Sequence, residues 1–237
     1  MAIVMLVFDP LQRLAHRYGE RPHEIVVGIF QRTLIAIMHI TGMRLEVERS
    51  PLVEPHTGYV IVSNHQGMFD IPIFGGLLFT NYPKYIAKHT LAKWIPSVSY
   101  NLRNGGNVLI DRDQGTEAVR AIRDMGRRVQ ERGVSAVIFP EGTRSVDGEL
   151  LPFKEAGATT LIKAASSLSI VPVAVDGSWE FVSRSMRPIP FGTRLKVYFG
   201  EPIERHKGED PTELLARAEK TIRATLERWR SGGGASL

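Results

Sequence analysis

Two polar segments that directly follow apolar runs hold the residue types needed for proton transfer and for anion binding. In the first, the run 59–63 leads into Asn64 and His65, and Gly67 and Asp70 follow. Gly67 lets the loop fold back, so the Asp70 carboxylate can reach the His65 imidazole. A carboxylate bonded to one ring nitrogen leaves the other as a general base near neutral pH. The spacing predicts a His65–Asp70 base pair; the alternative is a structural histidine and a helix N-cap at Asp70.

The second segment, residues 139–145, reads Phe-Pro-Glu-Gly-Thr-Arg-Ser and follows the run 136–139. Gly142 permits a tight turn, Thr143 offers a hydroxyl, and Arg144 can donate two parallel hydrogen bonds to a phosphate. A surface turn with a solvated arginine is the alternative for this loop taken alone. Two more runs end in basic residues, Lys88 and Arg112. Neighbouring strands would therefore bring a base and several cations to one sheet edge.

Other catalytic motifs are missing from the sequence. The chain has no Cys, no Gly-x-Ser-x-Gly, no His-Glu-x-x-His, no P-loop and no Gly-x-Gly-x-x-Gly after a strand. These absences argue against a cysteine or serine nucleophile, a zinc hydrolase and a nucleotide-binding enzyme. If His65 is a base, it should activate a group of the substrate, and the reaction should be a direct transfer.

The elements that must position these residues follow an α/β pattern. From residue 44 onward, short β-branched runs alternate with stretches of helical periodicity, which is typical of βαβ units. The expected strands are 44–48, 59–63, 85–88, 107–110, 136–139, 170–175 and 195–200. We expect a mixed, largely parallel sheet flanked by helices.

Two of the intervening helices have a clear apolar stripe. Helix 116–132 should bury Val119, Ile122, Met125 and Val129. The last helix should begin with Asp210 as N-cap and Pro211 as its first residue. Its expected core residues are Leu215, Ala218, Ile222, Leu226 and Trp229.

The N-terminal segments 1–14 and 25–40 are rich in large apolar residues. Arg32 lies near the middle of the second, and a central arginine costs a spanning helix ~2.5 kcal/mol or more. We expect a helical element that lies in or on a membrane; an ordinary buried helix is the alternative. No secretory signal is expected, because residues 1–8 lack a basic residue. The predicted organisation is 1–43 as membrane-associated helices, 44–230 as the α/β domain and 231–237 as a flexible tail.

The charge distribution indicates an acidic partner. The 237 residues carry a net charge of +5, and segment 84–132 alone holds ten Lys or Arg against five Asp or Glu. A phosphorylated substrate and an anionic membrane both fit this excess. Nucleic acid fits less well, because no basic stripe interleaved with aromatic residues occurs.

Four motifs together resemble those of the glycerolipid acyltransferase family typified by lysophosphatidic acid acyltransferase. Asn64-His65-x4-Asp70 resembles the first motif and Val108-Leu-Ile-Asp-Arg112 the second. Residues 139–145 match the third letter for letter, and the proline-centred run 170–175 resembles the fourth. The residues 66–69 and 104–107 depart from the common family pattern, which concerns the acceptor head group rather than the chemistry.

The resemblance implies transfer of a fatty acyl group from acyl-CoA or acyl carrier protein to the free hydroxyl of lysophosphatidic acid, giving phosphatidic acid. His65 would be the base and Asp70 would orient it. Arg112, Arg144 and Lys88 would bind the phosphate, in a loop supported by Asn64, Glu141, Gly142 and Thr143. No metal and no cofactor are expected, since a thioester is already activated.

The resemblance also implies a membrane-associated protein, which we expect at the cytoplasmic face of the inner membrane. Two alternatives stay open. The acceptor could be another lysophospholipid or a lyso-aminolipid, or the chain could be a non-catalytic protein that binds anionic lipid.

Overall fold

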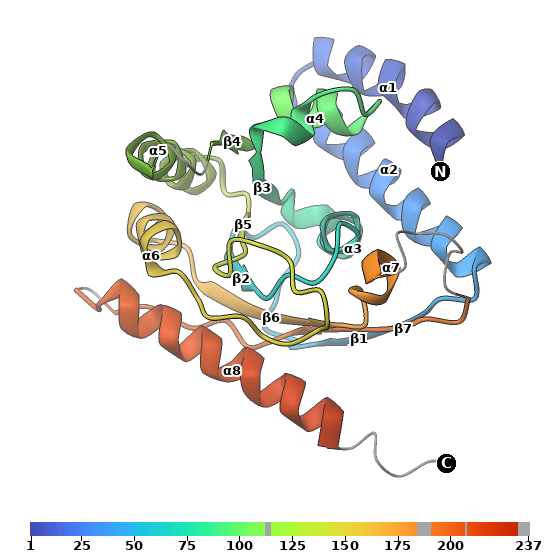
Figure 1. Cartoon of the computed structure of the whole chain (residues 1–237). Coiled ribbons are helices and arrows are strands. Elements are labelled where there is room, and N and C mark those ends of the chain that lie inside the picture. The colour runs from blue at the N-terminus through green and yellow to red at the C-terminus, as the bar shows by residue number, and fades with distance from the viewer. Residues whose placement is uncertain (112–114, 184–190, 207, 232–237) are drawn as a thin grey trace.

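The computed structural model describes residues 1–111, 115–183, 191–206 and 208–231, and within them a seven-stranded sheet lies between two layers of helices (Figure 1). All seven expected strands form, each within one residue of its expected ends. They are β1 (Arg44–Arg49), β2 (Val60–Ser63), β3 (Lys84–Lys88), β4 (Val108–Ile110), β5 (Ala136–Ile138), β6 (Ile170–Asp176) and β7 (Arg194–Phe199). The α/β prediction is therefore confirmed.

The strand order brings the predicted site loops together. The order is β1-β7-β6-β2-β5-β3-β4, and each neighbouring pair is parallel except β6 and β7. The five strands β6, β2, β5, β3 and β4 thus point the same way. Their carboxyl ends lie along one edge of the sheet, where folds of this class place their sites.

The helices connect the strands and cover both faces of the sheet. They are α1 (Ala2–Arg17), α2 (Glu20–Ile40), α3 (Asp70–Leu77), α4 (Val98–Asn104), α5 (Gly115–Arg132), α6 (Glu155–Ala164), α7 (Glu180–Ser183) and α8 (Pro211–Ser231). Two short 3₁₀ helices, η1 (Phe79–Asn81) and η2 (His89–Ala92), flank β3. In Figure 1, α5, α6 and α8 lie on one side of the sheet, and α2, α3 and α7 lie on the other.

Two apolar cores result from the alternation of side chains along the strands. Val60 and Val62 of β2 face the core under α5, α6 and α8. Ile61 between them faces the second core, with Phe74 of α3. Because successive residues of a strand point to opposite faces, a fully apolar strand is buried on both sides. β2 is therefore held rigidly where its loop begins.

The last helix forms as expected. Pro211 is its first residue, and Asp210 Oδ1 accepts a hydrogen bond of 2.9 Å from Thr212 N. The five residues predicted for its core are all buried.

The buried stripe of α5 is one turn shorter than expected. Ile122, Met125 and Val129 are buried, but Val119 is exposed, so that prediction was wrong. Ile122 faces Gly157 in the first turn of α6. Val119 lies one turn before Ile122 and has no part of α6 opposite it, because α6 starts only at Glu155.

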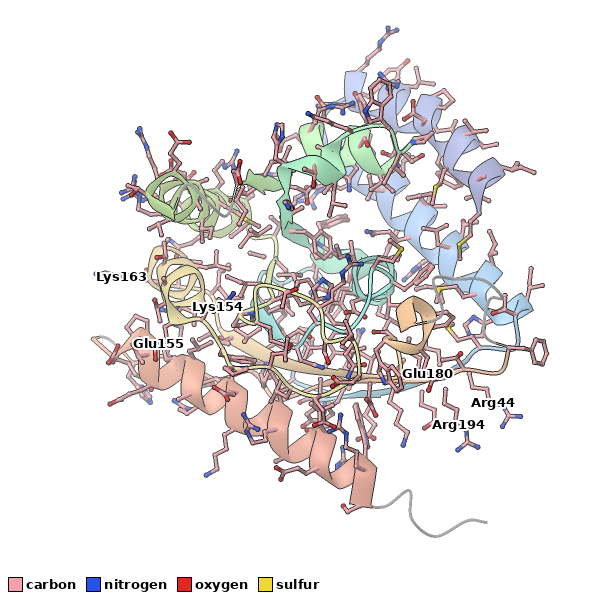
Figure 2. All side chains as sticks on the ribbon, viewed as in Figure 1. Arg44, Lys154, Glu155, Lys163, Glu180 and Arg194 are labelled. Carbon is pink, nitrogen blue, oxygen red and sulfur yellow. The ribbon has the colours of Figure 1, made fainter. Side chains whose placement is uncertain are left out.

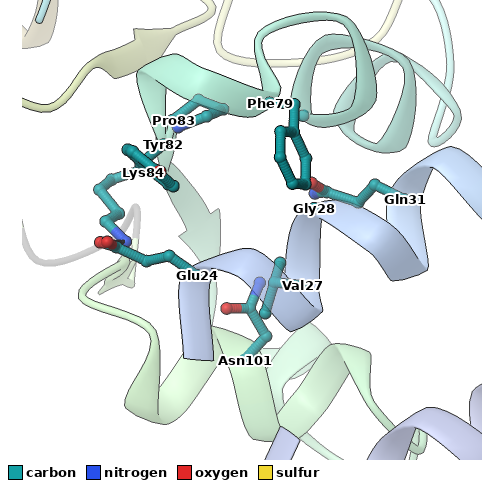
Figure 3. A pocket seen from close by; sticks show the side chains of 10 residues that line it. Glu24, Val27, Gly28, Gln31, Phe79, Tyr82, Pro83, Lys84 and Asn101 are labelled. Carbon is teal, nitrogen blue, oxygen red and sulfur yellow. Dashed lines mark ion pairs between the residues drawn. The ribbon is translucent and has the colours of Figure 1, made fainter. Parts of the chain in front are cut away.

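The N-terminal helices form a hairpin that is joined to the sheet through α2. α2 packs on α1 and on α3. Its Glu24 is buried and forms an ion pair with Lys84 of β3 (Figure 3). A second ion pair, at 2.8 Å, joins Glu24 to Arg132 of α5. By length and composition α2 could cross a membrane, although 44% of its apolar window is buried against the rest of the protein.

Candidate active site

The loop between β2 and α3 brings the predicted histidine and aspartate together. The Nδ1 atom of His65 lies 2.7 Å from Oδ2 of Asp70. The same oxygen accepts hydrogen bonds from the backbone N–H groups of Gln66, at 2.8 Å, and Gly67, at 2.9 Å. The other oxygen, Oδ1, accepts one from the hydroxyl of Ser178. The Asp70 side chain is fully buried, so these four donors replace the water that an ionised carboxylate needs.

The N-cap role considered for Asp70 is wrong. α3 begins at Asp70 itself, with Phe69 at the N-cap position and no side-chain cap. The carboxylate instead turns back into the loop that precedes the helix. Gly67 permits this close fold, since a Cβ there would lie 2.7 Å from the backbone oxygen of Ser178.

Contacts with the β5 loop fix the His65 ring from a second side. The ring stacks on Phe139, with centroids 4.0 Å apart and planes inclined by 18°. The backbone carbonyl of His65 accepts a hydrogen bond of 2.8 Å from Ser145 N. About 15% of the His65 side chain is exposed, and within the described ranges Nε2 has no hydrogen-bond partner. The arrangement can therefore present Nε2 to an incoming group while Asp70 holds Nδ1–H.

Glu141 is buried and holds the His65 loop through hydrogen bonds to backbone N–H groups. Its Oε1 accepts a hydrogen bond of 2.6 Å from His65 N, and its Oε2 accepts one of 3.0 Å from Leu151 N. Burial raises the pKa of Glu141 from its ordinary value of 4.5 to about 7, and the two backbone donors oppose that rise. Gly142, which follows, adopts a φ of 67°, a conformation that favours glycine. Glu141 and Gly142 thus shape the turn, whereas Thr143 and Arg144 are exposed on it.

Asn64 fastens the start of the His65 loop to β6. Its Nδ2 donates to Val175 O, and its Oδ1 accepts from Val175 N, both at 2.8 Å. Gln66 adds a bond of 3.0 Å from Nε2 to the carbonyl of Gly148. The Asn64 amide continues the hydrogen bonding of the sheet beyond the end of β2, and the Gln66 amide holds the loop on the other side of His65.

The predicted basic residues lie at the same edge but are less constrained. Lys88 ends β3, Arg144 follows β5, and both are exposed. Arg112 lies outside the described residues. The topology thus brings His65, Lys88 and Arg144 to the carboxyl ends of three neighbouring strands.

The sequence reasoning missed Ser178 and the stacking role of Phe139. Ser178 comes two residues after the carboxyl end of β6, 108 residues from the aspartate it contacts. The rule that sites gather at carboxyl ends of strands could have singled it out. Nothing in the local sequence indicates that Phe139 lies against an imidazole.

Comparisons with known proteins agree with the motifs. The Acyltransferase family model matches residues 44–176. The human "1-acyl-sn-glycerol-3-phosphate acyltransferase alpha" is 28% identical over 213 residues, covering 87% of this chain and 73% of the human protein. The sheep protein of the same name is also 28% identical, over 212 residues, covering 87% of this chain and 72% of its own.

A solved structure shares the fold. The crystal structure of the 1-acyl-sn-glycerophosphate acyltransferase PlsC from Thermotoga maritima aligns with a TM-score of 0.71 and 24% identity. The alignment covers 94% of this chain and 84% of that one.

Proposed function

The chain belongs to the acyltransferase family, and on that premise we propose that it acylates lysophosphatidic acid to phosphatidic acid. The acyl donor is acyl-CoA or an acyl carrier protein, and the acceptor is the free hydroxyl of the lysolipid. The hydrogen-bonded pair of His65 and Asp70 at the carboxyl edge of the sheet is the observation that carries the proposal. The names of the human and sheep relatives favour this acceptor.

In the proposed reaction, His65 Nε2 takes the proton of the acceptor hydroxyl while the oxygen attacks the thioester carbon. Asp70 accepts Nδ1–H throughout and stabilises the imidazolium that forms. When the C–S bond of the tetrahedral intermediate breaks, the imidazolium returns its proton to the departing thiolate. The products are the ester and the free thiol. No cofactor is needed in this scheme, because the thioester already carries the activated acyl group.

The acceptor phosphate is proposed to bind Arg144, Arg112 and Lys88. Arg144 directly precedes Ser145, whose N–H donates a hydrogen bond to the His65 carbonyl. Arg144 is therefore one residue from a contact with the His65 loop. A guanidinium can hold two phosphate oxygens in a fixed orientation. A phosphate held there would leave the rest of the lysolipid free to reach toward His65.

The protein is proposed to work on a membrane, at the cytoplasmic face of the inner membrane. Both lipid substrate and lipid product are membrane components, and α1 exposes Ile3, Leu6, Val7, Leu11 and Leu14. The burial of part of α2 against α3 favours a hairpin that lies on the bilayer over a helix that crosses it.

A thiol-release assay tests the proposal. Purified protein would be given acyl-CoA or acyl carrier protein with lysophosphatidic acid, other lysophospholipids and a lyso-aminolipid in turn. We expect free thiol and phosphatidic acid with lysophosphatidic acid at the highest kcat/KM. A clear preference for another lysolipid would contradict the acceptor, and no thiol release with any pair would contradict the proposed reaction.

A further inference from the structure

The segment Leu91–Trp94, here named the Trp94 loop, presents an unusually exposed aromatic residue. Trp94 is 95% exposed, and Leu91 beside it is also exposed. The segment comprises the last two residues of η2 and the two that follow it, close after the carboxyl end of β3. In water an exposed tryptophan leaves its apolar ring without apolar contacts. At a bilayer surface the ring can contact lipid chains while the polar N–H donates a hydrogen bond at the headgroup level.

The backbone around the Trp94 loop is held in conformations that side chains rarely adopt. Trp94 has a φ of 69° and Ser97 a φ of 63°, both in the left-handed region. Such a conformation is unfavourable for a residue with a side chain, and it persists only where the surroundings impose it. The backbone is thus strained at the point where Trp94 is exposed to solvent.

Contacts with α1 impose this conformation. Ser97 N donates a hydrogen bond of 2.8 Å to Asp9 Oδ1, and Ser97 Oγ donates one of 2.6 Å to the carbonyl of Met5. The Ile95 N–H donates 3.0 Å to the hydroxyl of Ser99. The Trp94 loop is therefore attached to the hairpin helix proposed to contact the membrane, although 85 residues separate Trp94 from Asp9.

The exposed face of α1 has the same chemistry. Along α1, exposed apolar side chains recur at three-, four- and seven-residue intervals on one face, at Ile3, Leu6, Val7 and Leu14. Arg13 and Arg17 of the same helix are exposed. Apolar residues with adjacent cations are typical of helices that lie in a membrane interface.

The charge around the loop favours an anionic surface. Residues 84–110 contain no Asp or Glu, and besides Lys84, which is buried and paired with Glu24, they contain Lys88, Lys93 and Arg103. Lys88 and Lys93, on either side of Leu91, are both exposed. Each lysine near an anionic bilayer contributes about 1 kcal/mol, or roughly fivefold in affinity.

We propose that the Trp94 loop is a second membrane-contacting element, distinct from the N-terminal helices, and that its partner is an anionic bilayer. It lies just beyond β3, whose carboxyl end shares an edge with the His65 loop. Two contacts, at the hairpin and at the Trp94 loop, fix the tilt of the sheet on the bilayer. The inference rests on the proposed membrane-borne acceptor, and it assigns the loop the task of turning the catalytic edge toward that acceptor.

Vesicle sedimentation tests the inference directly. The full chain and Trp94→Ala would be mixed with vesicles of phosphatidylcholine, with and without phosphatidylglycerol. We expect Trp94→Ala to weaken binding roughly tenfold, given the apolar area a tryptophan buries, and Trp94→Phe to restore most of it. Lys93→Gln should weaken binding only to the anionic vesicles.

Matched controls lie on other faces of the molecule. Leu52 is 59% exposed in the β1–β2 connection, at the opposite edge of the sheet from His65, so Leu52→Ala should bind as the unmodified chain does. Lys163 points outward from α6, away from the hairpin (Figure 2), so Lys163→Gln is the charge control. Circular dichroism would establish that each variant is folded.

Two outcomes would overturn the inference. One is vesicle binding by Trp94→Ala equal to that of Leu52→Ala. The other is a lipid-free dimer, seen by sedimentation velocity, that Trp94→Ala dissociates, since the loop would then bind a second copy. Vesicle binding needs no turnover, so a chain that binds through Trp94 but releases no thiol contradicts the proposed function and leaves this inference standing.

Discussion

The two ends of the candidate active site are built differently. At the His65 end, the Asp70 carboxylate accepts four hydrogen bonds in full burial, and the imidazole is stacked and bonded from two loops. At the basic end, the side chains of Lys88 and Arg144 are exposed and, within the ranges the structure covers, form no hydrogen bond or ion pair. The geometry of the proposed proton transfer is thus set before substrate arrives, and the proposed anion binding is left to solvated side chains.

This difference follows from what each end must do. A base and its orienting carboxylate gain from a fixed geometry, because reorganisation during the reaction would raise the barrier. Long cationic side chains that wait in water can meet a phosphate on a mobile lipid, and they lose rotamer freedom only when it binds. Changes at the first end should alter kcat, and changes at the second should alter KM.

The largest effect should come from His65→Ala, which removes the proposed base. We expect kcat to fall roughly 10²–10⁴-fold, with little change in the thermal midpoint, because His65 is partly exposed and lies in a loop. Thiol release and circular dichroism would be measured together. His206→Ala, at an exposed loop position, is the control. Activity within tenfold of the unmodified enzyme would remove His65 from the base role.

Arg144→Ala should act on binding instead. Losing one charge-assisted bond to phosphate should raise KM for lysophosphatidic acid about 10–100-fold and leave kcat nearly unchanged. An acceptor without phosphate should show no such rise, and neither should Arg217→Ala on α8. An equal effect on both acceptors would exclude Arg144 from phosphate binding and would weaken the contrast between the two ends.

Glu141→Gln should change how stability depends on pH. The folded-state pKa of Glu141 is raised to about 7 from 4.5, so the folded chain binds its proton more tightly than the unfolded chain does. The unmodified protein should therefore lose stability relative to Glu141→Gln as pH rises from 4.5 through about 7. We expect a relative loss of about 3 kcal/mol in denaturant unfolding. A constant difference between the two proteins across this range would contradict the burial of a carboxyl that titrates there.

Of the changes at the His65 end, Ser178→Ala should have the smallest effect on kcat. Three donors to Asp70 remain, so kcat should fall only about fivefold, as expected for one hydrogen bond. Without the Ser178 hydroxyl the carboxylate is less stabilised and holds the imidazolium more strongly. The acid limb of the kcat/KM profile should therefore move to higher pH. A lower kcat with an unmoved profile would mean that Ser178 acts through stability alone, and exposed Ser167→Ala should change neither quantity.

The sequence predicted the sheet and the contact between His65 and Asp70 for a shared physical reason. Buried strands demand continuous β-branched runs, and polar residues that interrupt such a run mark its end, so β2 and the His65 loop were visible together. Three contacts join residues that are 60 to 108 positions apart in the sequence. They are the Ser178–Asp70 hydrogen bond, the stacking of His65 on Phe139 and the Glu24–Lys84 ion pair. No local periodicity encodes such contacts. The sequence left the N-cap alternative open for Asp70 because the same short carboxylate suits both an N-cap and a folded-back loop.

The buried ion pairs of Glu24 have a consequence for how the chain folds. Lys84, the first residue of β3, is buried, and burial lowers its pKa. Glu24 of the hairpin supplies the opposite charge. Removing residues 1–43 to obtain a water-soluble catalytic fragment would leave that ammonium without its partner, and breaking such a pair costs about 3–5 kcal/mol. That is a large share of the whole stability of a domain. The hairpin is therefore part of the cooperative folding unit and cannot be treated as a detachable anchor.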